Sequence, residues 1–182
     1  SLLRKYEPDI IQGYPSALAI LADACWRGTC SDIQARLIFT FAELLDYRTR
    51  KTLGSVFNAT IMDVYASAEF GLMAWECPEQ HGYHINADNV VMEFLRHSEV
   101  LNSLKDGKII CTSLTNYVMP LIRYEIGDIG IPMDEQCLCG RPFPLMKIVE
   151  GRTGDFLVTL DDRIIPPTVF FPFPFDEPTW IK

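Results

Sequence analysis

The sequence lacks several features that would assign a broad class of function at once. Lysine and arginine number 16 against 24 aspartates and glutamates, which leaves a net charge of −8. Nucleic acids and anionic membrane surfaces are bound through clustered basic side chains, so this balance argues against both as the main partner. No apolar run approaches the roughly 20 residues of a membrane span, and no basic segment followed by an apolar one marks a secretory signal. We therefore expect a cytoplasmic protein that binds neither nucleic acid nor a membrane.

The first 70 residues alternate between strand and helix patterns. Apolar strands are predicted near residues 9–12, 35–40 and 60–66, and helices near residues 15–28 and 43–57. The helical assignments rest on apolar side chains that recur every three to four residues. Short links between these segments favour parallel strand pairing with right-handed crossovers. This part therefore predicts a partial parallel α/β sheet.

The pattern changes after Gly71, where short runs of β-forming residues take over. They lie at residues 84–95, 107–115 and 120–133, with Asp106-Gly107 as a tight turn between two of them. This is typical of antiparallel strands and predicts a small β-barrel-like module or a curled sheet. The predicted fold class is thus α/β plus β. Three parallel strands that lead into a β module suggest a part of a larger protein.

The segment "DVYASAEFG" directly follows the third predicted strand. Open α/β sheets bind ligands at this carboxyl end of their strands. Tyr65 offers a ring that can stack on a base, and Glu69 offers a carboxylate that suits Mg²⁺. The small side chains that permit close backbone approach are Ala66, Ser67 and Ala68. Taken alone, a Glu after a strand is equally typical of an ordinary loop.

Two further segments carry polar groups between apolar ones. In "PLIRYEIGDIG" the pair Gly127-Asp128 is predicted to form a turn, where a carboxylate can accept two hydrogen bonds from a ribose diol. A solvated hairpin Asp is the alternative. In "EGRTGDFL" two glycines bracket Arg152, which suits ribose or phosphate binding, and the flexible turn suits a hinge.

The three motifs, in this order, resemble those of the adenylate-forming (AMP-dependent) ligases, in particular the phenylacetate–CoA ligase-like branch. That family's Tyr-Gly-x-Ser/Thr-Glu loop, which binds adenine and Mg²⁺, is similar to Tyr65–Glu69. Its Arg-Tyr-x-x-x-Asp segment, which holds the ribose, matches Arg123-Tyr124 and Asp128. Its Gly-Arg-x-x-Asp hinge matches Gly151-Arg152 and Asp155. With the opening "EPDIIQGYPSALAILA", the resemblance covers nearly the whole chain.

The resemblance implies a ligase that activates an aryl or acyl carboxylate with ATP to an acyl-adenylate and transfers it to a thiol such as CoA. Glu69, linked to Mg²⁺, and Arg152 would be catalytic. The nucleotide would be held by Tyr65, Ala66, Ser67, Ala68, Asp128 and Arg152. The small-molecule partners expected are the carboxylate, ATP and CoA. The acyl group and the oligomeric state stay open, with a homodimer as one option.

The resemblance also implies a division of the chain. Residues 1–150 would be the later portion of the large adenylating domain, with the α/β part at 1–75 and the β module at 76–150. Residues 151–182 would be the hinge and the start of the small domain. The family's phosphate loop and adenylation lysine would lie outside the chain, so we expect this piece to be inactive or severely impaired.

Two residues depart from the family pattern. The Gly of the adenine loop is Ala66, and the hydroxyl residue before the Glu is Ala68, which removes a phosphate contact. These departures favour an alternative function: a non-catalytic relative, stapled by zinc, that acts as a binding or structural module.

Five of the six cysteines fall into two groups, and Cys30, just past a glycine in a predicted loop, indicates no specific role. Cys25 and Cys111 lie in apolar segments and are expected to be buried thiols in a reducing compartment. Cys77, His84, Cys137 and Cys139 form a Cys-x6-His pair and a Cys-x-Cys pair, which supply three thiolates and an imidazole. This is a normal set of ligands for structural Zn²⁺.

The zinc prediction has alternatives. Cys77 can instead form a disulfide with Cys137 or Cys139, or the thiols can be free and His84 a surface residue. Some phenylacetate–CoA ligase-like proteins resemble this arrangement and carry zinc there. The family's Gly-x-His favours His84 over His81 as the ligand.

Overall fold

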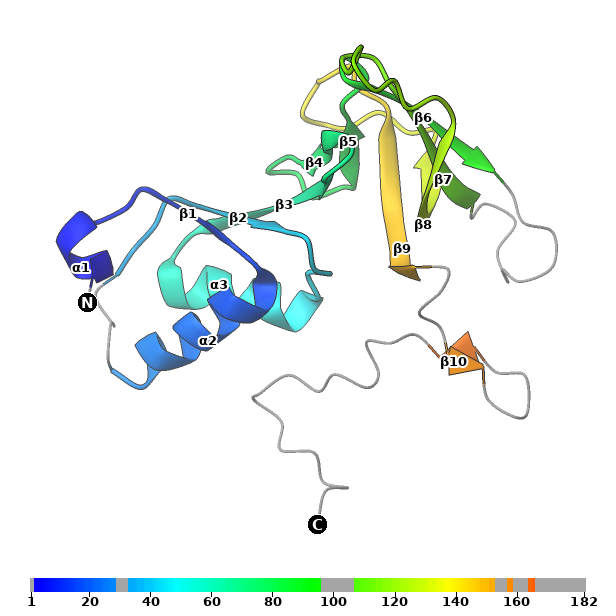
Figure 1. The fold of residues 1–182 in the computed structure, drawn as a ribbon. Helices are drawn as coiled ribbons and strands as arrows, with labels where there is room; N and C mark the ends of the chain where they lie inside the picture. The colour runs from blue at the N-terminus through cyan, green and yellow to red at the C-terminus, as the bar shows by residue number, and fades with distance from the viewer. Residues whose placement is uncertain (1, 29–32, 96–106, 153–156, 159–163, 166–182) are drawn as a thin grey trace. The chain divides into compact units, whose positions relative to one another are not determined.

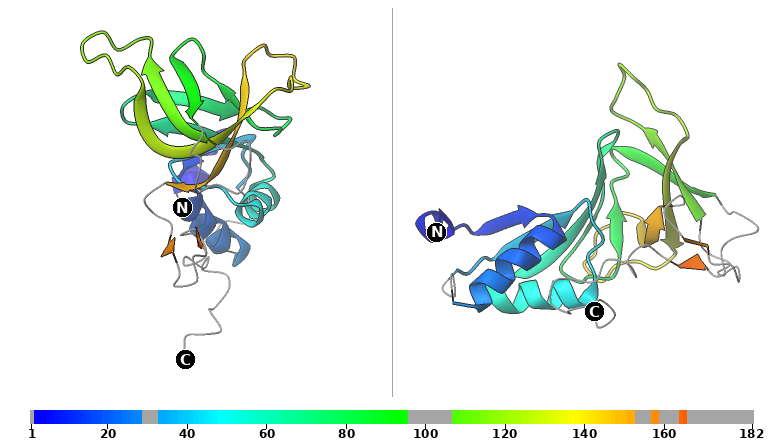
Figure 2. Two further views of the ribbon diagram at one scale, coloured as in Figure 1. Left: turned by 90° about the vertical axis from the view of Figure 1, so that its right-hand side faces the viewer. Right: turned by 60° about the horizontal axis from the view of Figure 1, so that its bottom comes forward.

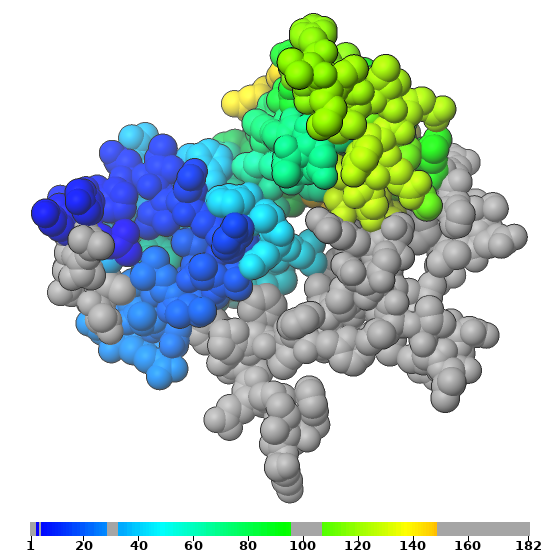
Figure 3. All heavy atoms as spheres, in the orientation of Figure 1, coloured from blue at the N-terminus to red at the C-terminus, as the bar shows by residue number. Residues whose placement is uncertain are grey.

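The structure is a computed structural model that describes residues 2–28, 33–95, 107–152, 157–158 and 164–165. All other residues are drawn in grey in Figure 1 and Figure 3. The chain divides into two compact units, Ser1–Tyr83 and His84–Lys182.

The first unit is an α/β layer. Its elements are α1 (Leu2–Tyr6), β1 (Ile10–Gly13), α2 (Pro15–Trp26), β2 (Leu37–Phe41), α3 (Tyr47–Phe57), β3 (Thr60–Ser67) and β4 (Gly71–Glu76). The strand order is β1-β2-β3-β4. The first three strands are parallel, as predicted, and β4 pairs antiparallel with β3. The strand β4 was not predicted from the sequence.

Both long helices begin and end at residues suited to those positions. Pro15 is the first residue of α2, and Gly28, just beyond its end, has φ of +93°. At the start of α3, the Asp46 carboxylate accepts hydrogen bonds from the backbone N–H groups of Arg48 (2.8 Å) and Thr49 (3.1 Å). Asn58 ends α3 in the left-handed conformation.

The core of the first unit lies between the parallel strands and the two helices α2 and α3, which cover the same face of the sheet (Figure 2). It consists of Ile11, Leu18, Ala22, Cys25, Ile33, Ala35, Ile38, Leu53, Phe57 and Ile61. No helix among the described residues is long and apolar enough to cross a membrane.

Cys25 differs in one respect from its predicted state. It is buried in the core, as expected, but it is disulfide-bonded rather than a thiol. The other cysteines among the described residues are not disulfide-bonded. The prediction of a thiol was therefore wrong for Cys25.

The second unit is an antiparallel β module. Its strands are β5 (Tyr83–Ile85, whose first residue belongs to the first unit), β6 (Val90–Leu95), β7 (Gly107–Ser113), β8 (Tyr124–Met133) and β9 (Leu145–Arg152). They follow the order β5-β9-β8-β7-β6, so the sheet is open rather than a closed barrel. The short strands β10 (Leu157–Val158) and β11 (Ile164–Ile165) pair antiparallel with each other.

Candidate functional site

The predicted adenine-loop residues lie on a β hairpin in the first unit. The strand β3 continues through Tyr65 to Ser67, so the motif is more strand than loop, and a turn at residues 68–70 leads into β4. The Ser67 hydroxyl accepts a hydrogen bond of 3.2 Å from the Phe70 N–H, which tightens the turn. Gly71 completes it with φ of +64°.

The motif side chains differ in exposure along this hairpin. The register between β3 and β4 shifts between Tyr65 and Ala66, which marks a bulge. Bulges redirect side chains and are common beside functional sites. Tyr65 and Ser67 are half-buried, whereas Ala66, Ala68 and Glu69 are exposed. An exposed carboxylate at a hairpin tip is accessible to a metal–nucleotide complex.

Asp128 and Arg152 are paired in register in the second unit. Asp128 lies within β8, and Arg152 lies within β9. The sequence predicted a turn at Gly127-Asp128, but both residues lie inside the strand, where Gly127 has φ of +89°. A register shift follows directly after Asp128. The turn-like sequence signal therefore arose from a bulge.

The Arg123 of the Arg-Tyr motif lies just before β8. It adopts a left-handed backbone conformation with φ of +50°. Its N–H donates to the Thr112 hydroxyl at 2.9 Å, and its Nε donates to the Glu93 carboxylate at 3.1 Å. Both side chains of that ion pair are largely exposed, so we expect it to contribute little to stability. Asp155 of the predicted hinge lies outside the described residues.

Cys111 lies next to this part of β8. It is fully buried in β7, as predicted, and it is paired in register with Tyr124. Burial, with a smaller contribution from the charge of Asp128, raises the pKa of the Cys111 thiol to about 12. Cys111 is therefore a neutral, inert core thiol.

The four predicted zinc ligands come together. One ligand atom each from Cys77, His84, Cys137 and Cys139 forms a group in which all atoms lie within 4.8 Å of one another. The Cys139 sulfur lies 3.4 Å from His84 Nε2. Tetrahedral Zn²⁺, with bonds of about 2.3 Å to sulfur and 2.0 Å to nitrogen, would hold such a pair about 3.5 Å apart.

The chemistry of this donor set also fits a metal. Cys77, Cys137 and Cys139 are not disulfide-bonded, so neither alternative disulfide is formed. His84 is fully buried, and burial lowers its pKa, with the Phe143 backbone acting in the opposite direction. A neutral imidazole is the form that binds metal. His81 is exposed and is not in the group, which contains His84 instead.

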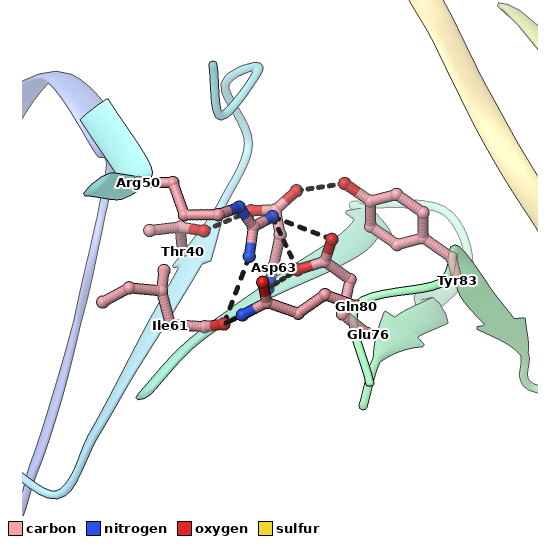
Figure 4. A network of polar contacts seen from close by, with 7 residues as sticks. All are labelled: Thr40, Arg50, Ile61, Asp63, Glu76, Gln80 and Tyr83. Carbon is pink, nitrogen blue, oxygen red and sulfur yellow. Dashed lines mark hydrogen bonds and ion pairs between the residues drawn. The ribbon is translucent and has the colours of Figure 1, made fainter. Parts of the chain in front are cut away.

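A buried polar network beside the hairpin was missed from the sequence. Asp63 of β3 is 5% exposed, and its carboxylate accepts hydrogen bonds from the hydroxyls of Thr40 and Tyr83 (Figure 4). Burial raises the pKa of Asp63, partly offset by these two hydrogen bonds. Burial and the nearby Asp63 charge also raise the pKa of Tyr83, so its hydroxyl keeps its proton and remains a donor.

The chain is similar in sequence to known CoA ligases. No family model matches the chain. It is 28% identical over 175 residues to a phenylacetate–coenzyme A ligase of Thermus thermophilus, and 28% identical over 177 residues to one of Pseudomonas putida. Each alignment covers 92% of the chain but only 39% of the relative. The chain thus spans about two-fifths of the length of these curated relatives.

Solved structures show the same fold. A 2-hydroxyisobutyryl-CoA ligase in the postadenylation state matches with a TM-score of 0.78 and 19% identity, over 92% of this chain and 37% of that one. An anthranilate CoA ligase in complex with anthranoyl-AMP matches with a TM-score of 0.67 and 14% identity, over 93% and 34%. The chain therefore has the fold of one part of a CoA ligase.

Proposed function

We propose that this chain is an internal part of an AMP-forming carboxylate–CoA ligase. The observation that carries the proposal is the sequence similarity to phenylacetate–coenzyme A ligases along 92% of the chain. The activity belongs to the longer protein, in which residues 1–150 complete the large domain and residues 151–182 begin the small one.

Each motif residue has a role in the proposed reaction. Tyr65 stacks on the adenine ring, and the backbone of Ala66, Ser67 and Ala68 lies close to the nucleotide. Asp128 accepts hydrogen bonds from the ribose hydroxyls. Arg152, which pairs in register with Asp128, is proposed to bind the ribose or a phosphate through its guanidinium group.

The proposed reaction has two halves. A carboxylate attacks the α-phosphate of ATP, which forms an acyl-adenylate and releases pyrophosphate. The thiol of CoA then attacks the acyl carbon and releases AMP. Mg²⁺, when bound, offsets phosphate charge. Glu69 supplies an exposed carboxylate for it at the hairpin tip.

The Cys/His group is proposed as a structural zinc site. Cys77, His84, Cys137 and Cys139 would occupy all four positions of a tetrahedral ion and leave none for substrate. The site would therefore hold the fold and take no part in the chemistry.

Pyrophosphate exchange tests the proposed activity in the longer protein. Glu69→Gln should slow exchange by at least tenfold, because the variant loses the charge that binds Mg²⁺. Glu79→Gln, an equally exposed Glu of the first unit, is the matched control and should leave exchange unchanged. Equal exchange in the wild type and Glu69→Gln would remove Glu69 from its proposed role.

The second candidate function is a non-catalytic binding or structural module. The absence of a hydroxyl at Ala68 favours it, since a phosphate contact expected of the family is missing. Calorimetric titration of the longer protein with Mg–ATP separates the two candidates. Binding supports the ligase, and no heat of binding at millimolar ATP would leave the non-catalytic module.

A further inference from the structure

Where β4 ends, side chains replace its backbone as the hydrogen-bond partners of β3. The last registered pair toward the end of β4 is Val64 with Trp75. Beyond it, the Glu76 carboxylate accepts a hydrogen bond of 2.8 Å from the Asp63 N–H. Arg50 of α3 donates to both oxygens of Glu76, at 2.8 and 2.7 Å. The side chains of Arg50 and Glu76 are only 19% and 8% exposed.

The same set also binds the next free carbonyl of β3. Ile61 O accepts hydrogen bonds from Arg50 Nη1 at 3.2 Å and from Gln80 Nε2 at 3.0 Å (Figure 4). A buried backbone group without a partner is costly, so these contacts replace those that another strand would provide. They fix the edge of β3 to α3 and to the segment that follows β4.

Tyr83 adds a second attachment point. Its hydroxyl donates to Asp63 Oδ2 at 2.6 Å, while the Thr40 hydroxyl donates to the other oxygen. Asp63 thus links β2, β3 and the residue that begins β5. Every member of the network lies in the first unit.

The network is attached to both ends of one short segment. Glu76 directly precedes Cys77, and Tyr83 directly precedes His84. Between them, the Gln80 N–H donates to Cys77 O at 2.9 Å and closes a turn. Two of the four candidate metal ligands therefore follow residues that the network holds.

We propose that Glu76 and Tyr83 are positioning residues for the metal site, because they set the spacing of Cys77 and His84 before a metal binds. This inference rests on the zinc site of the proposed function. Ligands held in place lose little conformational entropy on binding, so a pre-set spacing raises affinity without a new metal contact. The four polar residues that hold the spacing are Arg50, Asp63, Glu76 and Tyr83.

Co²⁺ titration of the full chain, followed by the absorption of the thiolate-bound ion, tests the inference. Tyr83→Phe removes the hydroxyl that bonds Asp63 and keeps the ring. Supporting-residue changes around metal sites typically cost about 10- to 100-fold in affinity, and we expect at least tenfold weaker binding. The absorption spectrum should be unchanged, since all four ligands remain. Tyr117→Phe, at a side chain that is 87% exposed, is the control and should match the wild type.

The conditions of the Co²⁺ titration distinguish a positioning role from a general loss of stability. Affinities are compared where urea unfolding shows each variant to be more than about 95% folded, because there a purely structural loss of a few kcal/mol leaves the apparent affinity unchanged. Gln80→Ala, which removes one hydrogen bond to Ile61 and no charge, serves as the milder second variant.

The results of the titration distinguish an error in the proposed metal site from an error in the positioning role. If the wild type fails to bind Co²⁺, the proposed metal site is wrong, and this inference with it. If the wild type binds and both Tyr83→Phe and Gln80→Ala bind equally well, the metal site stands and the positioning role is wrong. Weaker binding by the two variants, with an unaltered spectrum, supports the role.

Discussion

Asp63 is a carboxyl group enclosed by the fold and held between two hydroxyl donors. Its environment favours the neutral form, because burial removes the water that would solvate the charge. The nearby Glu76 acts in the same direction, and Arg50 acts against it. The free energy of unfolding therefore depends on pH through the titration of Asp63.

The sign of that dependence follows from proton binding. The folded state holds the Asp63 proton to a higher pH than the ordinary pKa of 3.8, so it binds more protons than the unfolded state in that interval. The free energy of unfolding therefore falls as the pH rises through the folded pKa of Asp63. Asp63→Asn lacks this titration, so its pH profile should lack this fall relative to the wild type.

Urea unfolding between pH 3.5 and 7 measures the difference. The exposed Asp88→Asn is the control and should leave the shape of the wild-type profile unchanged. A wild-type profile parallel to that of Asp63→Asn over the whole range would contradict the assignment.

Little in the sequence indicated this network, for a physical reason. Arg50 and Glu76 are 26 residues apart, and each reads as an ordinary charge at a helix or strand end. Only their meeting in space makes them a buried pair. Asp63 was visible as the first residue of a motif, but its two hydroxyl donors come from other segments.

At the scale of elements, α3 depends on its first turn. The Asp46 carboxylate accepts from two backbone N–H groups that would otherwise lack helical partners. Asp46→Ala should lower the free energy of unfolding by about 1 kcal/mol. Asp46→Asn keeps an acceptor oxygen and should lose far less. Urea denaturation of the three proteins checks the order, and equal losses in both variants would show that the cap does not act through its oxygen.

Two glycines should respond to alanine in opposite ways. A Cβ at Gly130 in β8 would lie 2.9 Å from the Phe94 ring and 3.0 Å from Ile109, so Gly130→Ala overpacks the β module by about 1–3 kcal/mol. A Cβ at Gly54 within α3 meets nothing closer than 3.6 Å. Gly54→Ala should therefore stabilise the helix by about 0.5–1 kcal/mol. Thermal unfolding gives both signs, and a neutral Gly130→Ala would mean that the Phe94 ring moves aside.

Elements were predicted well where the apolar period was clear. The three parallel strands and α2 lie within a few residues of their predicted bounds. The strand β4 was missed because "GLMAWE" follows the hairpin turn without the proline or paired glycine that usually separates strands. Gly127 was predicted to lie in a turn because glycine is common in both bulges and turns. The sequence alone does not distinguish the two.

At the scale of the whole molecule, the proposed metal should couple to stability. An ion that binds only the folded chain stabilises it by about 2.7 kcal/mol at 100 times its dissociation constant. For a chain of this size that corresponds to a rise in Tm of about 5–10 °C. Zn²⁺ should produce this rise in the reduced wild type, and Mg²⁺ should not, because three thiolates select a soft ion.

The double variant Cys137→Ser/Cys139→Ser is the control for this effect. It removes two ligands of the group and should show no rise in Tm with Zn²⁺. A similar rise in the wild type and the double variant would place the bound ion elsewhere.

For the candidate metal site as a whole, the sequence identified the ligands but not the residues that hold those ligands in place. The Cys and His spacing was enough to select the four residues that the fold brings together. Nothing in that spacing indicated what holds the segment from Cys77 to His84, because the supporting atoms come from α3, β2 and β3. The spacing of residues in the sequence can indicate which of them bind one metal ion. The contacts that hold those residues in place depend on tertiary packing.

The Arg50–Glu76 ion pair also restricts how the sequence can change over time. Loss of either partner alone leaves a buried charge uncompensated, at a cost of about 3–5 kcal/mol. Loss of both avoids that cost but removes the Glu76 acceptor of the buried Asp63 N–H. A lineage can therefore leave this pair only through two near-simultaneous substitutions. We expect descendants of this sequence to keep both residues or to have lost both.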